Sequence, residues 1–339
     1  MQTFVTGATG FVGANLVRLL IKEGYQVKVL ARKNSTRKNL EGIPVEFVEG
    51  DLLDRSSLRA GVRGCSLVFH VAAEYRLWGN PKSLYLTNVQ GTQALIEEAW
   101  KAGAQRILYT SSVAAIPPRE NPPADETSVY PDVAPVIGHY KKSKFLAEQV
   151  ALNLARQGAP VVIVNPSTPI GAYDIKPTPT SKNLILDFLQ RRMPAILDTG
   201  LNLVDVEDVA QGHLLAARHG KLGERYILGG ENLTLQQIFN HLSSFTSIPV
   251  PRLKIPYPIA YLAGALSTGQ AYLFDSEPRI PLEGVRMARH KMFYDSSKAK
   301  KELGYVASPI LPALKRAVEW FRSNEYARPR LASRDLRLG

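Results

Sequence analysis

Thr6-Gly7-Ala8-Thr9-Gly10-Phe11-Val12-Gly13 is the stretch of sequence that decides the fold. It follows a short apolar run at 3–5 and opens a segment with apolar residues at helical spacing, which predicts a strand, a glycine turn and a helix. Glycines allow positive φ and a close approach of ligand to backbone, and the start of a helix offers free N–H groups to a phosphate. The Gly-x-x-Gly-x-x-Gly spacing differs from the commonest dinucleotide fingerprint. The turn therefore predicts a pyrophosphate site, with a tight turn that binds no ligand as the alternative.

The composition indicates a soluble α/β protein with a sizeable core, since 45% of the 339 residues are hydrophobic. The formal net charge of +12 suits anionic small molecules such as nucleotides, and no nucleic-acid-binding module is visible, so no nucleic-acid partner is expected. The single Cys65 excludes an intrachain disulfide framework and fits a reducing compartment. Because a strand is expected almost at Met1, no room is left for a secretory leader, and we expect a cytoplasmic protein.

One stretch, Ile255–Phe274, carries no charged residue and is about long enough to span a bilayer. Its prolines, glycines and polar residues, among them Pro256, Gly264 and Gln270, dilute the hydrophobicity that insertion requires. We expect a buried or half-buried helix of a second lobe, and a peripheral contact with a membrane surface remains open.

The first half of the chain alternates strand-like apolar runs with helical segments, which predicts a parallel sheet covered on both faces. Helices are expected from Phe11, from near Ser56, and over 81–101 and 140–157. The predicted class is α/β, a Rossmann-type doubly wound sheet whose dinucleotide-binding domain spans 1–165, with ligands at the carboxyl ends of the strands. The expected strands are Thr3–Val5, Gln26–Ala31, Val45–Val48, Leu67–Val71, Arg106–Thr110 and Val161–Asn165.

After residue 165 the pattern changes. The segment 165–183 contains four prolines, which excludes a regular helix and indicates a binding loop or lid. The chain from 166 to 325 predicts a smaller, mostly helical substrate lobe with returns to the sheet, and 326–339 predicts a basic, frayed tail. A strand is expected at 225–228, and helices at 184–191, from Val206 with Asp205 as its cap, and at 234–245, 259–274, 296–303 and 311–324, with Thr234 and Ser296 as caps.

A candidate catalytic group lies about a helix length beyond the fifth strand. Tyr140 and Lys144 are four residues apart, so on a helix they are neighbours on one face. A cation beside a phenol favours the phenolate and lowers the tyrosine pKa, which makes Tyr140 a candidate general acid or base. The fifth strand ends in Ser111-Ser112, whose hydroxyls could hold a substrate oxygen. An ordinary solvated Tyr/Lys pair is the alternative.

These motifs together resemble the extended short-chain dehydrogenases/reductases over roughly residues 1–325. The cofactor turn at 6–13 is followed by the motifs Gly50-Asp51-Leu52, His70-Val71-Ala72-Ala73, Thr87-Asn88-Val89-Gln90-Gly91-Thr92, Asp205-Val206-Glu207-Asp208-Val209-Ala210 and Tyr294-Asp295-Ser296-Ser297-Lys298.

The resemblance implies Tyr140 as the acid/base, Lys144 as its pKa-lowering partner and ribose ligand, and Ser112, rather than Ser111, as the donor that polarises the substrate oxygen. Asn88 would support the surroundings of Lys144 or a bound water, or else cap a helix that begins near Val89. The residues expected to bind the cofactor are Gly7, Thr9, Gly10, Phe11, Val12, Gly13, Arg32, Asp51, Leu52, Ala72, Ala73, Tyr140 and Lys144.

The choice of cofactor depends on the end of the second strand. An NAD site usually places Asp or Glu about 20 residues past the glycines, but no acidic residue occurs between Lys28 and Asn39. Arg32 suits a 2′-phosphate, which a guanidinium can hold by paired hydrogen bonds. We therefore expect NADP(H) in preference to NAD(H), with a solvated basic loop as the alternative.

The substrate side is less well defined. Arg76 and Trp78 follow the fourth strand and are expected to face the substrate, together with Asn88 and Ser167. Arg252, Arg279 and Arg286 are weaker candidates for clamping a diphosphate. The six histidines lack metal-ligand spacing, so no metal site is expected.

Within the superfamily, runs such as Tyr75-Arg76-Leu77-Trp78 and Gly284-Val-Arg-Met-Ala-Arg289 resemble the hopanoid-associated sugar epimerases, which are themselves similar to dihydroflavonol 4-reductases. The resemblance implies an NAD(P)-dependent enzyme that transfers hydride at a secondary alcohol or ketone, acting on an activated sugar as an epimerase. The alternatives are an NADPH-dependent ketone reductase of the dihydroflavonol 4-reductase type and a non-catalytic NADP(H)-sensing protein. The resemblance also implies a homodimer through the helices at 81–101 and 140–157.

Overall fold

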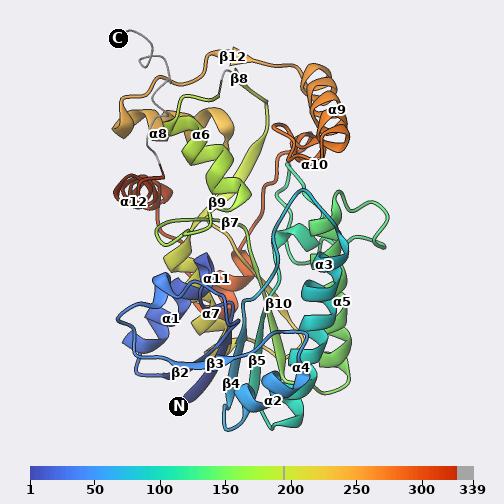
Figure 1. Ribbon diagram of the computed structural model, residues 1–339, viewed down its shortest axis with the longest axis vertical. Coiled ribbons are helices and arrows are strands. Elements are labelled where there is room, and N and C mark those ends of the chain that lie inside the picture. Colours follow the sequence, from blue (N-terminus) through green and yellow to red (C-terminus); the bar gives the residue numbers. More distant parts are fainter. Residues whose placement is uncertain (194, 327–339) are drawn as a thin grey trace, which may run out of the picture.

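A seven-stranded, wholly parallel sheet forms the centre of the protein (Figure 1). The computed structural model describes residues 1–193 and 195–326. The basic tail expected at 326–339 therefore lies, apart from Tyr326, outside the described residues. The strands in spatial order are β10 (Arg225–Leu228), β6 (Val161–Pro166), β5 (Arg106–Thr110), β4 (Leu67–His70), β1 (Gln2–Thr6), β2 (Gln26–Ala31) and β3 (Glu46–Glu49).

Helices cover both faces of this sheet, as the alternating apolar runs predicted. On one face α1 (Phe11–Lys22), α7 (Val206–His219) and α11 (Ser297–Leu303) build an apolar core with the strands. On the other face α2 (Arg55–Val62), α4 (Gly91–Lys101) and α5 (His139–Arg156) build a second core. Because β1 lies between β4 and β2, the strand order reverses there, and the turn after β1 opens at the switch point where such sheets bind ligands.

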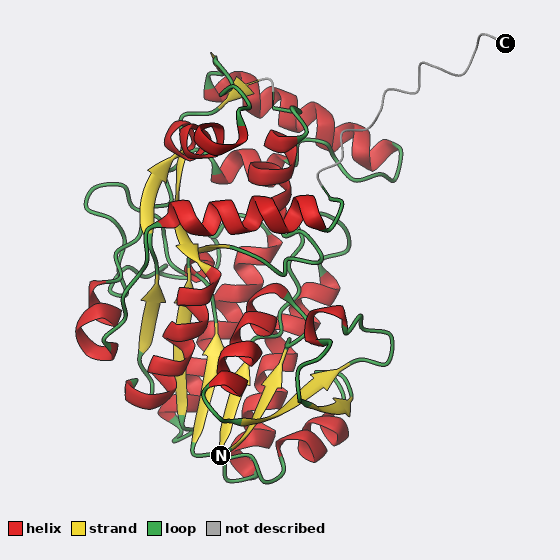
Figure 2. Ribbon diagram, turned by 90° about the vertical axis from the view of Figure 1, so that its left-hand side faces the viewer, coloured by secondary structure: helices red, strands yellow, loops and turns green. Residues whose placement is uncertain are grey.

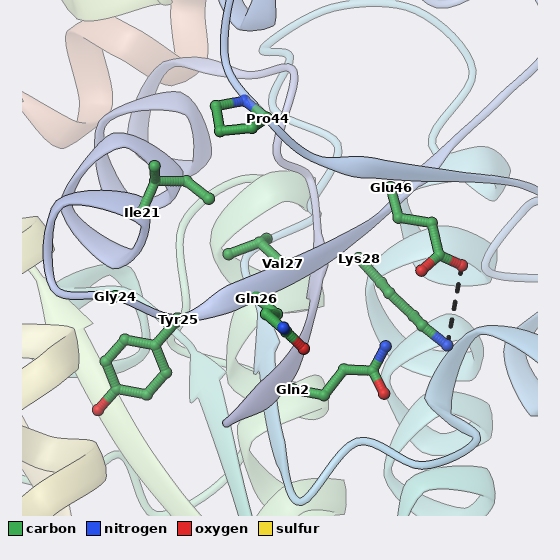
Figure 3. A pocket seen from close by; sticks show the side chains of 9 residues that line it. All are labelled: Gln2, Ile21, Gly24, Tyr25, Gln26, Val27, Lys28, Pro44 and Glu46. Atoms are coloured by element: carbon green, nitrogen blue, oxygen red, sulfur yellow. Dashed lines mark ion pairs between the residues drawn. The ribbon is translucent and has the colours of Figure 1, made fainter.

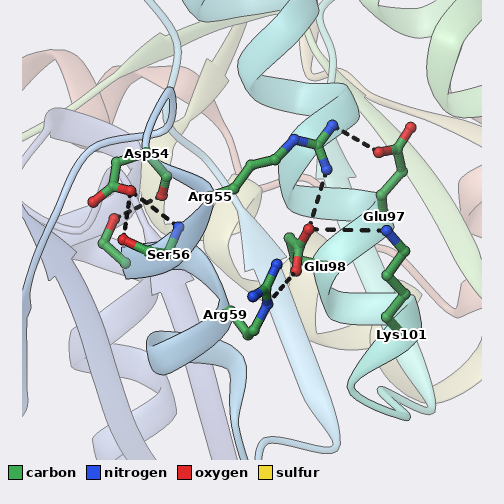
Figure 4. A network of polar contacts seen from close by, with 8 residues as sticks. Asp54, Arg55, Ser56, Arg59, Glu97, Glu98 and Lys101 are labelled. Atoms are coloured by element: carbon green, nitrogen blue, oxygen red, sulfur yellow. Dashed lines mark hydrogen bonds and ion pairs between the residues drawn. The ribbon is translucent and has the colours of Figure 1, made fainter.

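Ion pairs fasten α2 to α4 around one buried carboxylate (Figure 4). The Glu98 side chain is only 3% exposed and accepts hydrogen bonds from Arg55 (3.1 Å) and Arg59 (3.0 Å). Arg55 also pairs with Glu97 at 2.7 Å. The hydrogen bonds from Arg59 and Arg55 lower the pKa of the Glu98 carboxyl, and the bond from Arg59 has the largest effect.

The helix expected over 81–101 is interrupted. α3 (Lys82–Tyr85) passes into a wider π-helical turn, Leu86–Gln90, before α4 begins at Gly91. The extra residue in such a turn rotates the side chains that follow it, and here it places Asn88 inside the protein, 2% exposed. A similar wide turn, Ser181–Leu186, precedes α6 (Asp187–Leu189) where a regular helix was expected at 184–191.

The second lobe lies beyond the carboxyl ends of the sheet (Figure 2). Of its helices, α8 (Leu235–Thr246), α9 (Tyr257–Leu273) and α12 (Ile310–Ser323) agree with the expected ranges to within two residues, whereas α10 (Leu282–Met287) was not expected. The side chains of Asp205 and Thr234 accept the N–H groups of Glu207 and Gln237 and so cap α7 and α8. Ser296 precedes α11 but its side chain makes no cap bond, because the Asp295 carboxylate accepts the Ser297 N–H instead. The lobe comprises α6, α8 (Leu235–Thr246), α9 (Tyr257–Leu273), α10 (Leu282–Met287) and α12 (Ile310–Ser323).

Five short strands of this lobe were not expected from the sequence. Pro169 within one strand and Gly200 at the start of another are residues that usually argue against a strand, which explains the omission. The strands are β7 (Thr168–Ile170), β9 (Gly200–Asp205) and β11 (Glu231–Thr234) in one small sheet, and β8 (Ala195–Ile196) and β12 (Leu253–Lys254) in another.

No helix among the described residues has both the length and the apolar character needed to cross a bilayer.

Candidate active site

The glycine turn after β1 is closely packed. Gly7 has φ +73°, and a Cβ added there would lie 2.5 Å from the Ala72 nitrogen. A Cβ on Gly13 would lie 2.1 Å from the Gly7 carbonyl oxygen. Both positions therefore require glycine. Gly10 precedes α1 without a side-chain cap, so no capping side chain competes for the first N–H groups of the helix at the switch point.

Two buried asparagines, which sequence reasoning missed, tie the proline-rich segment to this turn. Asn15 donates to the carbonyl of Ala172 (3.2 Å), and Asn39 donates to the carbonyls of Thr9 (3.1 Å) and Tyr173 (2.9 Å). No motif signals these bonds, and those to Ala172 and Tyr173 join residues more than 130 positions apart. They hold the segment after β7 beside the start of α1.

Tyr140 lies in the first turn of α5, next to the end of β5. The helix begins after Gly138, which has φ +82° and so adopts a conformation that favours glycine. A Cβ on Gly138 would also lie 2.7 Å from a carboxylate oxygen of Glu283. His139 is exposed and contacts the Tyr85 hydroxyl through Nδ1 (3.1 Å), so it does not enter the site.

Lys144 is buried beneath Tyr140, one helical turn further along α5. Its Nζ donates to the Thr110 carbonyl at 2.7 Å and lies 4.9 Å from the centre of the Tyr109 ring. Burial lowers the pKa of Lys144 to about 7, against a smaller opposing effect of Glu148. The amine is thus held rigidly at the end of β5 and changes charge near neutral pH.

The structure does not bear out the expectation that Lys144 lowers the pKa of Tyr140. Burial raises the pKa of the Tyr140 hydroxyl, the neighbouring Tyr75 raises it further, and only the Ser112 hydroxyl acts in the other direction. The spacing of four residues indicated the shared face but could not indicate how deeply the phenol is buried. Tyr140 is therefore a protonated phenol at neutral pH, suited to donate a proton.

Ser112 is the serine that faces Tyr140. Its oxygen accepts the Ala114 N–H at 3.1 Å, which leaves its own proton free for another acceptor. Ser111 is 4% exposed, and its hydroxyl has no hydrogen-bond partner among the described residues. The hydroxyl of Ser167 and the amide oxygen of Asn165, after and within β6, are likewise buried without a partner in this part of the chain.

A chain of hydrogen bonds links the glycine turn to the first turn of α5. His70 contacts the Thr6 hydroxyl (2.8 Å) and the Thr92 hydroxyl (2.9 Å), and burial lowers its pKa to about 3. Asn88 accepts the Glu74 N–H (2.7 Å) and donates to the Ser143 hydroxyl (2.9 Å), which donates to the Tyr140 carbonyl. Asn88 therefore braces α5 against the loop after β4. It does not cap a helix, since it lies within the π-helical turn.

An aromatic side chain covers Tyr140. The Tyr75 ring stacks on the Tyr140 ring with a centroid distance of 4.2 Å and an interplanar angle of 29°. The Tyr75 hydroxyl faces Thr180 of the proline-rich segment, while the residue as a whole is 38% exposed. Tyr75 belongs to the stretch 75–78 noted in the sequence, but no role was expected for it, because the loop after β4 has no periodic pattern.

The residues expected to face the substrate lie in different surroundings. Trp78 is half-buried and packs on Tyr272 of α9, with ring centroids 4.6 Å apart. Arg76 is exposed and forms an ion pair with Glu74 and a hydrogen bond to Ser83. Part of its charge is therefore already satisfied within the loop.

The remaining expected cofactor residues line the same edge of the sheet. Arg32 directly follows β2, is exposed, and has no side-chain partner among the described residues, whereas Arg37 stacks on Phe47 at 4.3 Å. Asp51 accepts the Leu53 N–H at 2.9 Å, and the Leu52 side chain packs into the core. Ala72 and Ala73 follow β4, and the Ala72 N–H donates to the Thr6 hydroxyl at 3.3 Å.

This edge fits a dinucleotide. The uncapped start of α1 suits the pyrophosphate, and the unpartnered hydroxyls of Ser111 and Ser167 at the far end suit a polar group such as a carboxamide.

A hollow of about 430 Å³ lies at the amino ends of β1 and β2, lined by Gln2, Gln26 and the Lys28–Glu46 ion pair (Figure 3). It is at the opposite edge from Tyr140 and plays no part in the site.

Comparison with known proteins identifies the family. Residues 3–229 match the NAD dependent epimerase/dehydratase family, which is two thirds of the chain. The chain belongs to this family. As an epimerase/dehydratase family member with Tyr140, Lys144 and Ser112 at one edge of a Rossmann-like sheet, it is an NAD(P)-dependent oxidoreductase.

Two curated family relatives match almost end to end. The chain is 48% identical over 330 residues to a putative dihydroflavonol 4-reductase of Synechocystis, with 96% of each chain covered. It is 36% identical over 327 residues to sterol demethylase protein B of Methylococcus capsulatus, covering 95% of this chain and 98% of that one. A solved nucleoside-diphosphate-sugar epimerase from Pseudomonas aeruginosa superposes with a TM-score of 0.79 at 26% identity, covering 96% and 99% of the two chains.

Proposed function

We propose that the protein is an NADP(H)-dependent oxidoreductase that reduces a ketone, or oxidises the corresponding secondary alcohol, on a large apolar substrate. The observation that carries this proposal is the Tyr75 ring stacked on Tyr140 at 4.2 Å. An acid/base beside an aromatic wall suits an apolar ring more than a sugar, whose hydroxyls would need polar partners.

The chain's own residues supply the proton and hold the substrate oxygen. When bound, the reduced nicotinamide supplies a hydride to the carbonyl carbon. Tyr140 donates its phenolic proton to the oxygen of that carbonyl, and Ser112 donates a hydrogen bond to the same oxygen. The high pKa of the Tyr140 hydroxyl keeps the proton in place until negative charge develops on the substrate.

Lys144 limits the cost of that proton transfer. Its amine lies one turn below Tyr140, and a phenolate forming there favours the ammonium form of Lys144. Because its pKa is about 7, the amine changes protonation with little free-energy cost at neutral pH. The hydrogen bond to the Thr110 carbonyl keeps the amine in position during the transfer.

Arg32 supports the preference for NADP(H). It is the first residue after β2, at the position where family members with NAD place a carboxylate, and its guanidinium is free among the described residues. A planar guanidinium can bind a 2′-phosphate through two hydrogen bonds at once. Asp51 then remains for the adenine side.

The names of the relatives favour reduction of a lipid-like ring. The two curated relatives are named for a reductase and for a sterol-modifying protein. A 3-keto sterol combines a reducible ketone with an apolar ring system, and it is therefore a suitable first test substrate.

A sugar epimerase is the second candidate, and the solved sugar epimerase at 26% identity supports it. Epimerisation uses the same hydride transfer twice, with rotation of the keto intermediate between the steps. A hopanoid-associated role fits either activity. The three arginines considered for a diphosphate clamp, Arg252, Arg279 and Arg286, are exposed side chains of the second lobe.

The state of the purified protein distinguishes the candidates. Mass spectrometry of the protein as isolated tests for a retained cofactor, and nicotinamide fluorescence follows the binding of added NADPH. A reductase yields a site that takes up NADPH and consumes it with a ketone. Tightly held NAD⁺ with no net consumption would support the epimerase. NADPH binding without turnover of any ketone or sugar would support a non-catalytic sensor.

A further inference from the structure

The outer face of α9 carries large apolar side chains on both sides of an interruption at Gly269 and Gln270, which are also exposed. Ile259, Leu262, Leu266 and Leu273 follow at intervals of three, four and seven residues, and their side chains are 59%, 61%, 64% and 81% exposed. Phe274, just after the helix, is 76% exposed. We call these five residues the α9 apolar face. The helix stands at one end of the second lobe (Figure 1).

This arrangement is the reverse of an ordinary surface helix. A surface helix turns apolar residues inward and charged residues outward. In α9 the inward residues are small, Ala260, Gly264 and Ala271, and Gly264 packs against Leu282 and Val285 of α10. No residue of α9 is charged. Single exposed leucines need no explanation, but four large aliphatic side chains exposed on one helix mark an interaction surface.

Basic residues lie on both sides of this face in the sequence. Arg252 and Lys254 precede α9, Arg279 and Arg286 follow it, and all four are exposed. Three acidic residues lie among them. One, Glu277, pairs with Lys182 at 3.6 Å, and Glu283 is turned toward Gly138; Asp275 is exposed. Between positions 252 and 289 the chain carries five basic and three acidic residues.

Two tyrosines border the same face. Tyr261 and Tyr272 are 43% and 75% exposed. Tyrosine is enriched where a protein meets the headgroup layer of a membrane, because its ring is apolar and its hydroxyl is polar. An apolar row with tyrosines beside it and cations at its ends matches the chemistry of an anionic bilayer surface.

We propose that the α9 apolar face docks on an anionic membrane surface, with the helix lying in the plane of the interface. A second copy of the chain is the other occupant to consider. Flanking cations on both partners would repel each other in such a pair, whereas they attract an anionic bilayer.

The docked helix adjoins the proposed substrate site. Tyr272 packs on Trp78, and Trp78 lies three residues beyond Tyr75, which covers Tyr140. Docking places the loop between β4 and α3 at the membrane surface. Delivery of a lipid substrate from the bilayer to Tyr140 follows from this placement only if the proposed function also holds.

Sedimentation with liposomes tests the docking directly. The full-length protein is mixed with vesicles of phosphatidylcholine alone and of phosphatidylcholine with 30% phosphatidylglycerol, the latter at low and high salt. We expect binding to the anionic vesicles that weakens as salt rises. In the Leu266→Gln/Leu273→Gln double variant, the affinity for anionic vesicles falls about tenfold or more, since two of the inserted side chains become polar.

The matched control is Leu222→Gln, at a leucine that is 55% exposed in the sheet domain. It should bind vesicles as the wild type does. Circular dichroism and NADPH binding verify that each variant is folded. A second variant, Arg279→Gln/Arg286→Gln, should bind anionic vesicles more weakly than the wild type, and its remaining binding should depend less on salt.

Three outcomes would overturn the proposal. They are failure of the wild type to bind anionic vesicles, equal binding by the leucine double variant, and a wild-type dimer in sedimentation equilibrium that this double variant converts to monomer. The last result would assign the face to a second copy. Failure of the proposed function is separate, because Tyr140→Phe should abolish turnover and leave vesicle binding unchanged.

Discussion

The Tyr75 ring lies parallel to the Tyr140 ring within 29°, with their centroids 4.2 Å apart. One ring belongs to the loop after β4 and the other to the first turn of α5, so the loop brings an apolar surface directly onto the candidate acid/base. The Tyr75 hydroxyl extends onward to Thr180 in the proline-rich segment. The stack therefore joins α5 to the loop after β4 and to the proline-rich segment.

Replacement of Tyr75 tests whether this stack positions the substrate. Tyr75→Ala removes the ring, and we expect a higher KM for an apolar ketone with a smaller change in kcat. Tyr75→Phe keeps the ring and loses only the contact with Thr180, so its KM should stay near that of the wild type. Steady-state kinetics of both variants measure this. Equal KM values for the two would show that the ring has no role in binding.

Tyr140→Phe removes the proton donor while keeping the stack. Loss of a general acid costs roughly 10²- to 10⁴-fold in turnover. NADPH affinity should change little, and nicotinamide fluorescence measures it in the same samples. A variant that retains full turnover would exclude Tyr140 as the acid.

Arg32→Ala tests the choice of cofactor. Removal of the guanidinium should weaken NADPH binding by more than tenfold, since charge-assisted bonds contribute about 1.5–3 kcal/mol each. NADH binding should be nearly unaffected. Lys33→Ala, at the next exposed basic residue, is the control and should shift the ratio of the two affinities much less. An unchanged ratio in Arg32→Ala would exclude the 2′-phosphate role.

Because the Lys144 amine is buried, we expect the stability of the folded protein to depend on pH. Its pKa is about 7 in the folded protein and 10.5 as the reference value, so between these pH values the unfolded chain binds more protons. The contribution of Lys144 is therefore most unfavourable below about pH 7 and is relieved as pH rises toward 10.5. Urea denaturation of Lys144→Met should show a gain over the wild type at pH 6.5 that shrinks by pH 9.5. A constant difference would contradict the burial of a proton-binding amine.

Glu98 should make the stability depend on pH in the acid range with the same sign as Lys144, because the unfolded chain again binds more protons and stability falls as pH falls. The folded pKa of its carboxyl lies below 4.5, so the pairing with Arg59 and Arg55 is present above that pH and is lost as pH falls through the folded value. Glu98→Gln should destabilise the protein at pH 7 by about 1–3 kcal/mol, because it weakens two charge-assisted bonds at a buried position. The difference from the wild type should diminish below about pH 4, and thermal denaturation measures it. Glu97→Gln, at a more exposed carboxylate, should have a smaller effect.

Much of the sheet domain could be predicted from the sequence, because its elements have regular periods. The apolar runs at 26–31 and 106–110 coincide with β2 and β5, and the glycine spacing located the turn before α1. Lys144 follows Tyr140 by one helical turn, so their shared helix face also followed from spacing.

The rest depends on contacts between distant segments. The stack of Tyr75 on Tyr140 and the bonds of Asn15 and Asn39 join loops that have no period of their own. The pKa of Tyr140 was predicted in the wrong direction because it depends on burial, which spacing alone does not indicate. Asn88 lies in a π-helical turn, and such turns have no sequence signature comparable to a cap.

The central claim is a single hydride transfer to a ketone with Tyr140 as proton donor. The most direct measurement incubates the protein with NADPH deuterated at the transferred position and a 3-keto sterol, and analyses the product by mass spectrometry. We predict an alcohol with one deuterium on the hydroxyl-bearing carbon, one NADPH consumed for each alcohol formed, and no product with Tyr140→Phe. An inert ketone, together with interconversion of a nucleotide sugar by tightly bound NAD⁺ and no net consumption of cofactor, would contradict the claim.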